Sequence, residues 1–302
     1  YRAAFCDHHC GQPVTSFGFM VVQTLSKQVM KRETPQQNAT QSLDWHDFGS
    51  ASAFGVYFAA TLIACGFVNY LFPLSFLQGH SAVTDFGDIS QHISGWWYFV
   101  HEPWHLPLLH TYKLDHPDGV SIAFTDSIPL AALFFKLLIT LIPQAFPEHF
   151  HYFGWWVGFV FIAQAVAATF LIRALGAKSW FAMLIAVGFA ITWPVLHARY
   201  HHSALMMQSI LLLGLSFYWL GQKRAWTSQR ASAALIVLCV VALMVHPYYL
   251  AMTVSLFIAF LVDQILKKES WLLQLWRLLS LLVLLSALIW LLGYTRHSAY
   301  DA

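Results

Sequence analysis

Residues 152–174 read YFGWWVGFVFIAQAVAATFLIRA and carry a single charge, Arg173, next to their C-terminal end. A helix of roughly 20 apolar residues spans the hydrocarbon core of a bilayer, which is about 30 Å thick. This stretch therefore predicts a transmembrane helix with its arginine at one membrane surface. Six further apolar stretches have a similar character, at 53–76, 179–196, 203–221, 231–246, 248–266 and 273–294.

The composition of the whole chain agrees with a membrane protein. Of the 302 residues, 58% are hydrophobic and 10% are charged, whereas a soluble domain has roughly 25% charged residues. We predict an all-α fold, a polytopic transmembrane helix bundle of about seven spans with interfacial helices in its first outer loop. The net charge is +2, which gives no argument for nucleic acid as a partner; the expected partner is the lipid bilayer.

A shorter apolar run, IPLAALFFKLLITLI at 128–142, decides the topology. At about 15 residues it extends only about 23 Å as a helix. If it does not cross the membrane, every basic cluster falls on the same side, as the positive-inside rule requires. We therefore predict an interfacial or re-entrant helix with Lys136 snorkelling. The basic residues used are Lys27, Lys31, Arg32, Arg173, Lys178, Lys223, Arg224, Arg230, Lys267, Lys268 and Arg277.

This topology divides the chain into two predicted parts. Residues 1–50 are predicted to form a cytoplasmic N-terminal segment, and 51–302 a transmembrane domain with an outer loop at 78–127 and the interfacial helix at 128–142. Met30 opens the sequence MKRE, which resembles a translation start. Our hypothesis is that residues 1–29 are not native to the protein.

The N-terminal segment also contains CDHHC at 6–10. Protein S-acyltransferases use an Asp-His-His-Cys motif within a cysteine-rich zinc domain. Here the other zinc ligands are missing, because the next cysteine is Cys65, and five consecutive residues do not easily surround an ion tetrahedrally. We interpret the match as accidental.

The outer loop contains TDFGDISQHISGWWYF at 84–99, which places two acids beside a membrane-like segment. Apolar residues from Ile89 to Val100, including Trp96 and Trp97, recur at helical spacing and predict an amphipathic helix on the membrane. Asp88 stands at its N-cap position, which leaves two interpretations: a helix cap alone, with the tryptophans as an aromatic belt, or a cap that also faces a phosphate. Asp85, outside that helix, is the lesser candidate.

A second acid stands before the 128–142 helix, in DHPDGVSIAFTDSIPL at 115–130. Asp118 and Gly119 predict a turn. Asp126 or Ser127 is expected to cap the helix that follows, with a proline near its first turn. Both candidate acids thus lie at helix N-termini, where free N–H groups suit an anion.

A third cluster is HARYHH at 197–202. Arg199 is suited to bidentate phosphate binding, and the alternative is a snorkelling anchor at the interface. His201 and His202 lie beside it. His246, before Pro247, is interpreted as the end of a helix. Metal binding is possible because Asp and His are abundant here, but no HExxH or similar tight spacing occurs that would indicate a site.

The stretches GDISQHISGWWYFVHEPWHLPL, GVSIAFTDSIPLAALFFKLL and FHYFGWW resemble an uncharacterised bacterial family of multi-pass membrane proteins. That family in turn resembles the GT-C superfamily of membrane glycosyltransferases. The resemblance covers roughly residues 50–294. It implies a first span that leads outward, followed by an outer loop with an acidic residue and interfacial helices.

The resemblance also implies roles. Asp88 would be the general base or a metal ligand and Asp126 the second acid, while Arg199 would hold the phosphate of a polyprenyl-phosphate-linked sugar. A cleft with Trp96, Trp97 and Trp104 would suit the isoprenoid. His92, His201 and His202 complete the expected substrate-binding residues. The cofactor is unknown, with a divalent metal as the candidate, and the expected location is the bacterial inner membrane with the N-terminus cytoplasmic.

The chain also departs from that superfamily. The familiar Asp-Asp or Asp-Glu pair is missing, and the chain ends at GYTRHSAYDA where many members continue; we expect a truncated chain that lacks an acceptor-binding domain. The alternative function is a non-enzymatic membrane component of surface-polysaccharide assembly or transport, with unknown protein partners. Transport is disfavoured because Gln164 and Gln208 are the main polar residues within the spans.

Overall fold

The computed structural model describes residues 51–80 and 88–295, with side chains from residues 54 and 89 onward in the two stretches. These described residues confirm the all-α fold: seven of their helices are long and apolar enough to cross a membrane. The long helices are α3 (Ala51–Leu71), α7 (Phe153–Ala174), α8 (Trp180–Ile191), α10 (Ser209–Gln222), α11 (Ser228–Val245), α12 (Pro247–Leu266) and α13 (Trp271–Leu292). Helix α8 reaches spanning length only together with the residues that follow it, and α10 with those that precede it.

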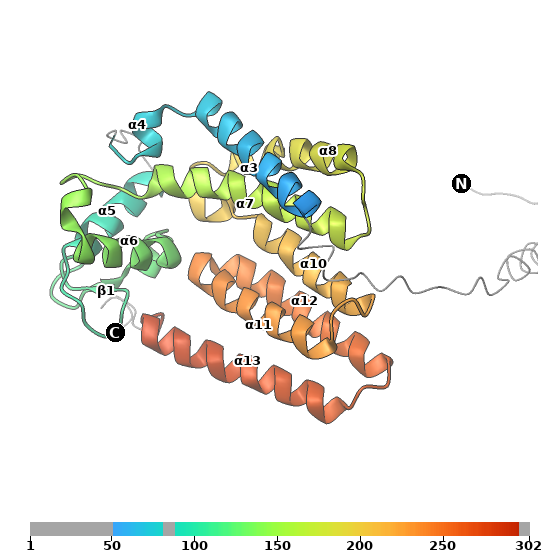
Figure 1. Cartoon of the computed structure of the whole chain (residues 1–302). Coiled ribbons are helices and arrows are strands. Elements are labelled where there is room, and N and C mark those ends of the chain that lie inside the picture. The colour runs from blue at the N-terminus through green and yellow to red at the C-terminus, as the bar shows by residue number, and fades with distance from the viewer. Residues whose placement is uncertain (1–50, 81–87, 296–302) are drawn as a thin grey trace, which may run out of the picture. The chain divides into compact units, whose positions relative to one another are not determined.

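Shorter elements connect the long helices. They are α4 (Leu74–Leu77), α5 (Asp88–Val100), α6 (Pro129–Leu141), α9 (Pro194–Ala198), the 3-10 helices η1 (Ile122–Phe124), η2 (Pro143–Ala145) and η3 (Ser203–Met206), and the antiparallel strands β1 (His110–Thr111) and β2 (Val120–Ser121). Figure 1 shows α5, α6 and β1 gathered at one end of the long helices. We call this the loop end of the bundle.

Proline interrupts two of the predicted spans. The helix expected over 53–76 ends at Leu71, and α4 starts after Pro73. The helix expected over 179–196 ends at Ile191, and Pro194 begins α9. Proline lacks the N–H that continues a helix and restricts the residue before it, so apolar runs that read as one span become two helices.

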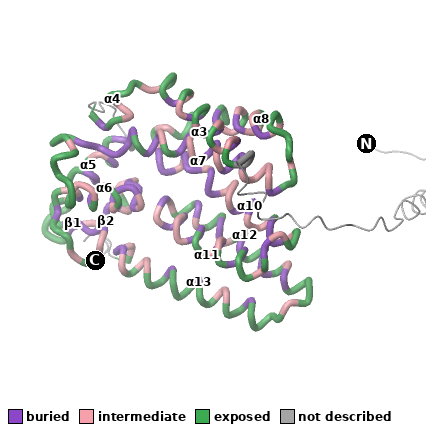
Figure 2. The backbone as a smooth tube through the Cα atoms, in the orientation of Figure 1, coloured by how far each residue is buried: buried purple, intermediate pink, exposed green. Residues whose placement is uncertain are grey.

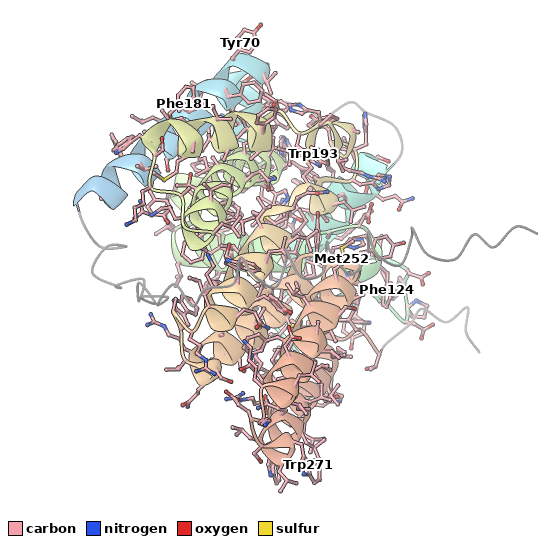
Figure 3. All side chains as sticks on the ribbon, turned by 90° about the vertical axis from the view of Figure 1, so that its right-hand side faces the viewer. Tyr70, Phe124, Phe181, Trp193, Met252 and Trp271 are labelled. Carbon is pink, nitrogen blue, oxygen red and sulfur yellow. The ribbon has the colours of Figure 1, made fainter. Side chains whose placement is uncertain are left out.

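The long helices divide into central and peripheral ones. Half of the α7 span is buried, against 17% of α13, and Figure 2 shows this difference in burial along the two tubes. The peripheral helices expose large apolar side chains, and Tyr70, Phe181 and Trp271 project outward in Figure 3. Since apolar side chains are stable when they face lipid, this surface agrees with an integral membrane protein.

Helix α6 stays beside the start of α7. The ring of Phe135, midway along α6, stacks on that of Tyr152 with centroids 6.0 Å apart. At the N-terminus of α6, the N–H of Ile128 donates to the same Tyr152 hydroxyl at 3.1 Å. Because both its start and its middle contact the residue before α7, α6 lies at the loop end and does not run the length of the bundle.

Lys136 on α6 corrects one expectation. It was predicted to snorkel, but its side chain is 3% exposed. Its Nζ lies 3.9 Å from the ring centroid of Phe99 and 4.8 Å from that of Trp104. Burial lowers the pKa of Lys136 to about 8, against the opposing field of Glu102. The ammonium is held by aromatic faces inside the protein, an arrangement that stabilises a cation away from water.

Candidate functional site

His92 lies in the interior of the loop end. It is 2% exposed, and its Nε2 lies 2.7 Å from the hydroxyl of Tyr152. Its Nδ1 lies 3.5 Å from the Oγ of Ser203 on η3. Burial lowers the pKa of His92 well below its usual value, so the ring is neutral near pH 7. His92 therefore joins α5 to α7 and η3, and its expected role in substrate binding stays a prediction.

Tyr152 is the centre of this buried network. Its hydroxyl accepts the N–H of Ile128 and can donate its own proton to His92 Nε2. No side chain caps α6, so the expectation that Asp126 or Ser127 caps this helix is wrong. Ser127 instead pairs with Thr125, with the two hydroxyl oxygens 2.9 Å apart. The N–H at the start of α6 is therefore bonded to the hydroxyl of Tyr152, which lies outside the helix, and not to an acidic side chain.

Close packing of α5 fixes the other side of residues 125–127. A Cβ atom added to Gly95 would lie 2.1 Å from the Oγ1 of Thr125 and 3.0 Å from the Oγ of Ser127. Only a glycine leaves room for this approach. The segment is thus clamped between α5 and Tyr152, and Asp126 projects from the middle of it.

Asp126 has the left-handed backbone conformation, with φ of 59°. This conformation is uncommon for residues other than glycine, and Asp tolerates it better than most. Its Oδ2 lies 3.2 Å from Nδ1 of His202, and the two side chains are 31% and 39% exposed. A carboxylate only accepts hydrogen bonds, so Nδ1 of His202 carries the proton and Nε2 is the basic atom of the neutral ring. The result is a solvent-accessible Asp–His pair on a rigid support.

His246 lies near this pair. It ends α11, and its Nδ1 accepts the N–H of Tyr248 at 3.2 Å, which confirms that it finishes a helix and shows that it also caps α12. Burial lowers the pKa of His246; the field of Asp126 raises it and that of His202 lowers it. Electrostatic proximity to the pair was not predicted. The only sequence signal was that HPYY and HARYHH were both expected on outer turns.

Arg199 and His201 lie on the same turn as His202. Arg199 is exposed just after α9, and its guanidinium makes no hydrogen bond or ion pair with any residue that the structure describes. It is within electrostatic range of the hydroxyl of Tyr249 at the start of α12. His201 is also exposed, with its ring 5.5 Å from that of Tyr200. A cation available for an anion therefore lies on the turn that carries His202.

A family model described as Domain of unknown function (DUF6311) matches residues 61–302. The chain belongs to this family. No curated protein and no solved structure matches the chain. The DUF6311 match covers the Asp126–His202 pair and the whole buried network that supports it.

The three tryptophans that were predicted to line a lipid cleft differ in their exposure. Trp96 is 1% exposed, and its Nε1 donates to the carbonyl of Phe150 at 2.9 Å. The expectation that Trp96 anchors the protein in the membrane is therefore wrong, and its expected contact with a donor lipid stays a prediction. Trp97 and Trp104 are exposed on the loop end, at 36% and 42%.

The structure describes the backbone of Asp88, the first predicted acid, but not its side chain. Helix α5 begins at Asp88, one turn before His92, so Asp88 is the first helical residue, whereas it was predicted as the N-cap residue before the helix. The side chain of Asp88, and all of Asp85 and the CDHHC stretch, lie outside the described residues. Among the described residues of the DUF6311 domain, no three His, Cys, Asp or Glu side chains come together as a metal-binding group.

Proposed function

We propose that the chain is a GT-C-type membrane glycosyltransferase that takes its sugar from a polyprenyl-phosphate donor at the loop end of the bundle. The observation that supports this most is the accessible Asp126–His202 pair on a buried, fully bonded network. A side chain held in a left-handed backbone position by packing on both sides is a common feature of functional sites. The resemblance of the sequence stretches to GT-C enzymes supplies the reaction type.

In the proposed reaction, a hydroxyl oxygen of the acceptor attacks the anomeric carbon of the donor sugar. The new glycosidic bond forms as the bond to the lipid phosphate breaks. The hydroxyl proton moves to Nε2 of His202, because Asp126 keeps Nδ1 protonated and stabilises the imidazolium that results. The phosphate leaves with the electron pair of the broken bond.

Arg199 is the proposed phosphate ligand. A guanidinium presents paired N–H donors that match phosphate oxygens, and that of Arg199 is exposed and unpaired among the described residues. Trp97 and Trp104 offer exposed apolar faces at the same end of the bundle. By analogy with the loop acid of GT-C enzymes, we propose that Asp88, at the start of α5, also takes part in the reaction.

The proposed orientation places the loop end on the outer face of a bacterial inner membrane, with the N-terminus cytoplasmic. It is supported by the basic residues of the three turns at the other end, of which Arg173, Lys223 and Lys267 are examples. Such residues accumulate on the cytoplasmic side.

The test is a transfer assay with purified protein in nanodiscs and a panel of polyprenyl-phosphate sugars. Asp126→Asn should abolish most transfer, whereas Asp118→Asn, an exposed acid of the same loop, should retain it. The alternative, a non-enzymatic component of surface-polysaccharide assembly, predicts instead a co-purifying protein partner and no binding of donor lipid.

A further inference from the structure

A second site lies at the end of the bundle away from Asp126. A cavity of about 390 Å³ opens between the α10–α11 turn and the α12–α13 turn. Helix α10 starts close to η3, which carries part of the Asp126 support, and ends at Gln222 beside this cavity. At 1.5 Å per residue, its 14 residues separate the two sites by about 20 Å. We call this cavity of about 390 Å³ the turn cavity.

The lining of the turn cavity is positively charged. Three cations line it, Arg224, Arg230 and Lys267, against one acid, Glu269. That acid is already engaged: its Oε2 accepts from Ser228 at 2.9 Å and from Gln274 at 3.0 Å, and lies 3.6 Å from an Arg277 nitrogen. The carboxylate of Glu269 is thus already paired, in part with Gln274 and Arg277 from outside the lining, and the cations remain in excess.

Arg224 is the cation best placed to bind a ligand. It is exposed, its backbone has φ of 57°, and its guanidinium makes no hydrogen bond or ion pair with any described residue. Lys267, in contrast, already donates to the carbonyl of Gln222 at 3.2 Å. Arg230 lies over the ring of Trp226, 4.8 Å from its centroid. Of the three cations, Arg224 is therefore the one that is available to a ligand.

A buried amide in the wall lacks a partner. Gln264 of α12 lines the cavity and is 3% exposed, and its Nε2 has no hydrogen-bond acceptor in the described part of the chain. Buried amide N–H groups are nearly always bonded, since leaving one unsatisfied is unfavourable. An acceptor atom of a bound ligand would satisfy it.

The N-terminus of α11 completes the site. Thr227 and Ser228 line the cavity at the start of this 18-residue helix. Among the described residues, one side chain caps a first-turn amide: the N–H of Arg230 donates to Thr227 Oγ1 at 3.2 Å. The other free N–H groups and the positive end of the helix dipole favour an anion.

From these features together, we propose that the turn cavity binds a phosphate group, carried either by a phospholipid headgroup or by a soluble phosphate compound. Its volume is near the lower end of ligand pockets, about 300–1,000 Å³, which suits a small phosphorylated group. Basic pockets between transmembrane helices are known sites for anionic headgroups. The proposal does not depend on the glycosyltransferase reaction.

The experiment uses the full chain, purified and delipidated in a neutral maltoside detergent. In one arm, native mass spectrometry follows titration with phosphatidylglycerol, with phosphatidylcholine as the lipid without net charge. In the other arm, the thermal midpoint is followed against inorganic phosphate, with chloride at equal ionic strength. The variants are Arg224→Gln, Lys267→Gln and Gln264→Leu, and the matched control is Lys268→Gln, an exposed neighbour outside the lining.

We expect saturable binding in at least one arm. Arg224→Gln and Lys267→Gln should each weaken it about tenfold or more, as for hydrogen bonds to charged groups, and Lys268→Gln by less than about twofold. Saturation only with phosphatidylglycerol assigns the ligand to a headgroup, and saturation with inorganic phosphate to a soluble compound. The proposal is overturned by the lack of saturable binding in both arms, or by equal losses in Lys267→Gln and Lys268→Gln. Arg224→Gln keeps the test valid if the buried Gln264→Leu variant fails to fold.

Discussion

The carboxylate of Asp126 lies 3.2 Å from Nδ1 of His202, although 76 residues separate the two in the chain. Each partner belongs to a segment tied to the same buried hydroxyl. The residue after Ser127 donates its N–H to Tyr152, and Ser203, next to His202, contacts His92, which contacts Tyr152. The pair is therefore a product of tertiary packing, and its geometry depends on residues that no substrate touches.

Glycine at position 95 should be required for this packing. Gly95→Ala places a Cβ against Thr125 and should lower the thermal midpoint. Gly66→Ala is the matched control, because a Cβ there meets nothing within 4 Å and alanine favours a helix by about 1 kcal/mol. Circular-dichroism melting in detergent measures both. Equal midpoints for the two variants would contradict the clamp around residues 125–127.

The hydroxyl of Tyr152 should contribute measurably to stability. Tyr152→Phe leaves the N–H of Ile128 and one nitrogen of His92 without their partner, at a cost of about 1–3 kcal/mol for each unsatisfied buried group. The comparison variant is Tyr248→Phe, whose ring is 67% exposed and which should melt like the unmodified protein. A Tyr152→Phe protein with an unchanged midpoint would show that the network is not structural.

Stability should fall below about pH 6.5 because His92 is buried as a neutral ring. Its folded-state pKa is lowered by burial, so below the unfolded value of about 6.5 the unfolded chain binds a proton that the folded chain does not. Each such group contributes a loss of up to about 1.4 kcal/mol per pH unit until the folded pKa is reached. His246, whose pKa is also lowered, adds in the same direction.

Melting between pH 7.5 and 5 measures this effect, with His92→Gln and His80→Gln as the pair to compare. His80 is exposed, so its replacement should leave the slope unchanged. His92→Gln should flatten it. A slope that stays the same in His92→Gln would exclude His92 as a source of acid sensitivity.

Arg199 should affect donor binding more than turnover. Arg199→Gln is expected to raise KM for the polyprenyl-phosphate donor about tenfold or more with a smaller change in kcat, since a charge-assisted contact to phosphate is lost. Arg199→Lys should recover part of the affinity. A variant with unchanged donor KM would assign Arg199 to the alternative role of an interface anchor.

The sequence alone was sufficient to predict the helix bundle, but it was not sufficient to predict the geometry of the candidate site. Long apolar runs define the spans, because bilayer thickness sets helix length. The breaks at Pro73 and Pro194 and the break between η3 and α10 altered them. The apolar face of α5 was predicted correctly as a helix, but helical spacing does not distinguish lipid from protein as its neighbour. For this reason Trp96 was wrongly predicted to face the membrane. Lys136 was wrongly predicted to snorkel for the same reason.

The site was predicted only in part for a different reason. Asp126 and His202 were each singled out by residue type and expected face. Their pairing, and the support from Tyr152, join segments whose sequence separation gives no local pattern. The unbonded amide of Gln264 is likewise visible only in three dimensions.

In the proposed reaction, Asp126 serves sugar transfer by orienting His202. The most direct measurement is the rate of transfer from the best polyprenyl-phosphate sugar of the panel by Asp126→Asn, Asp118→Asn and the unmodified protein, at matched folding by circular dichroism. We predict a loss in kcat of about 10²–10⁴-fold for Asp126→Asn, because the amide no longer holds His202, the proton-transfer group, in the required tautomer, and full activity for Asp118→Asn. Full activity of Asp126→Asn, or no transfer and no binding by the folded unmodified protein with any donor, would contradict the account.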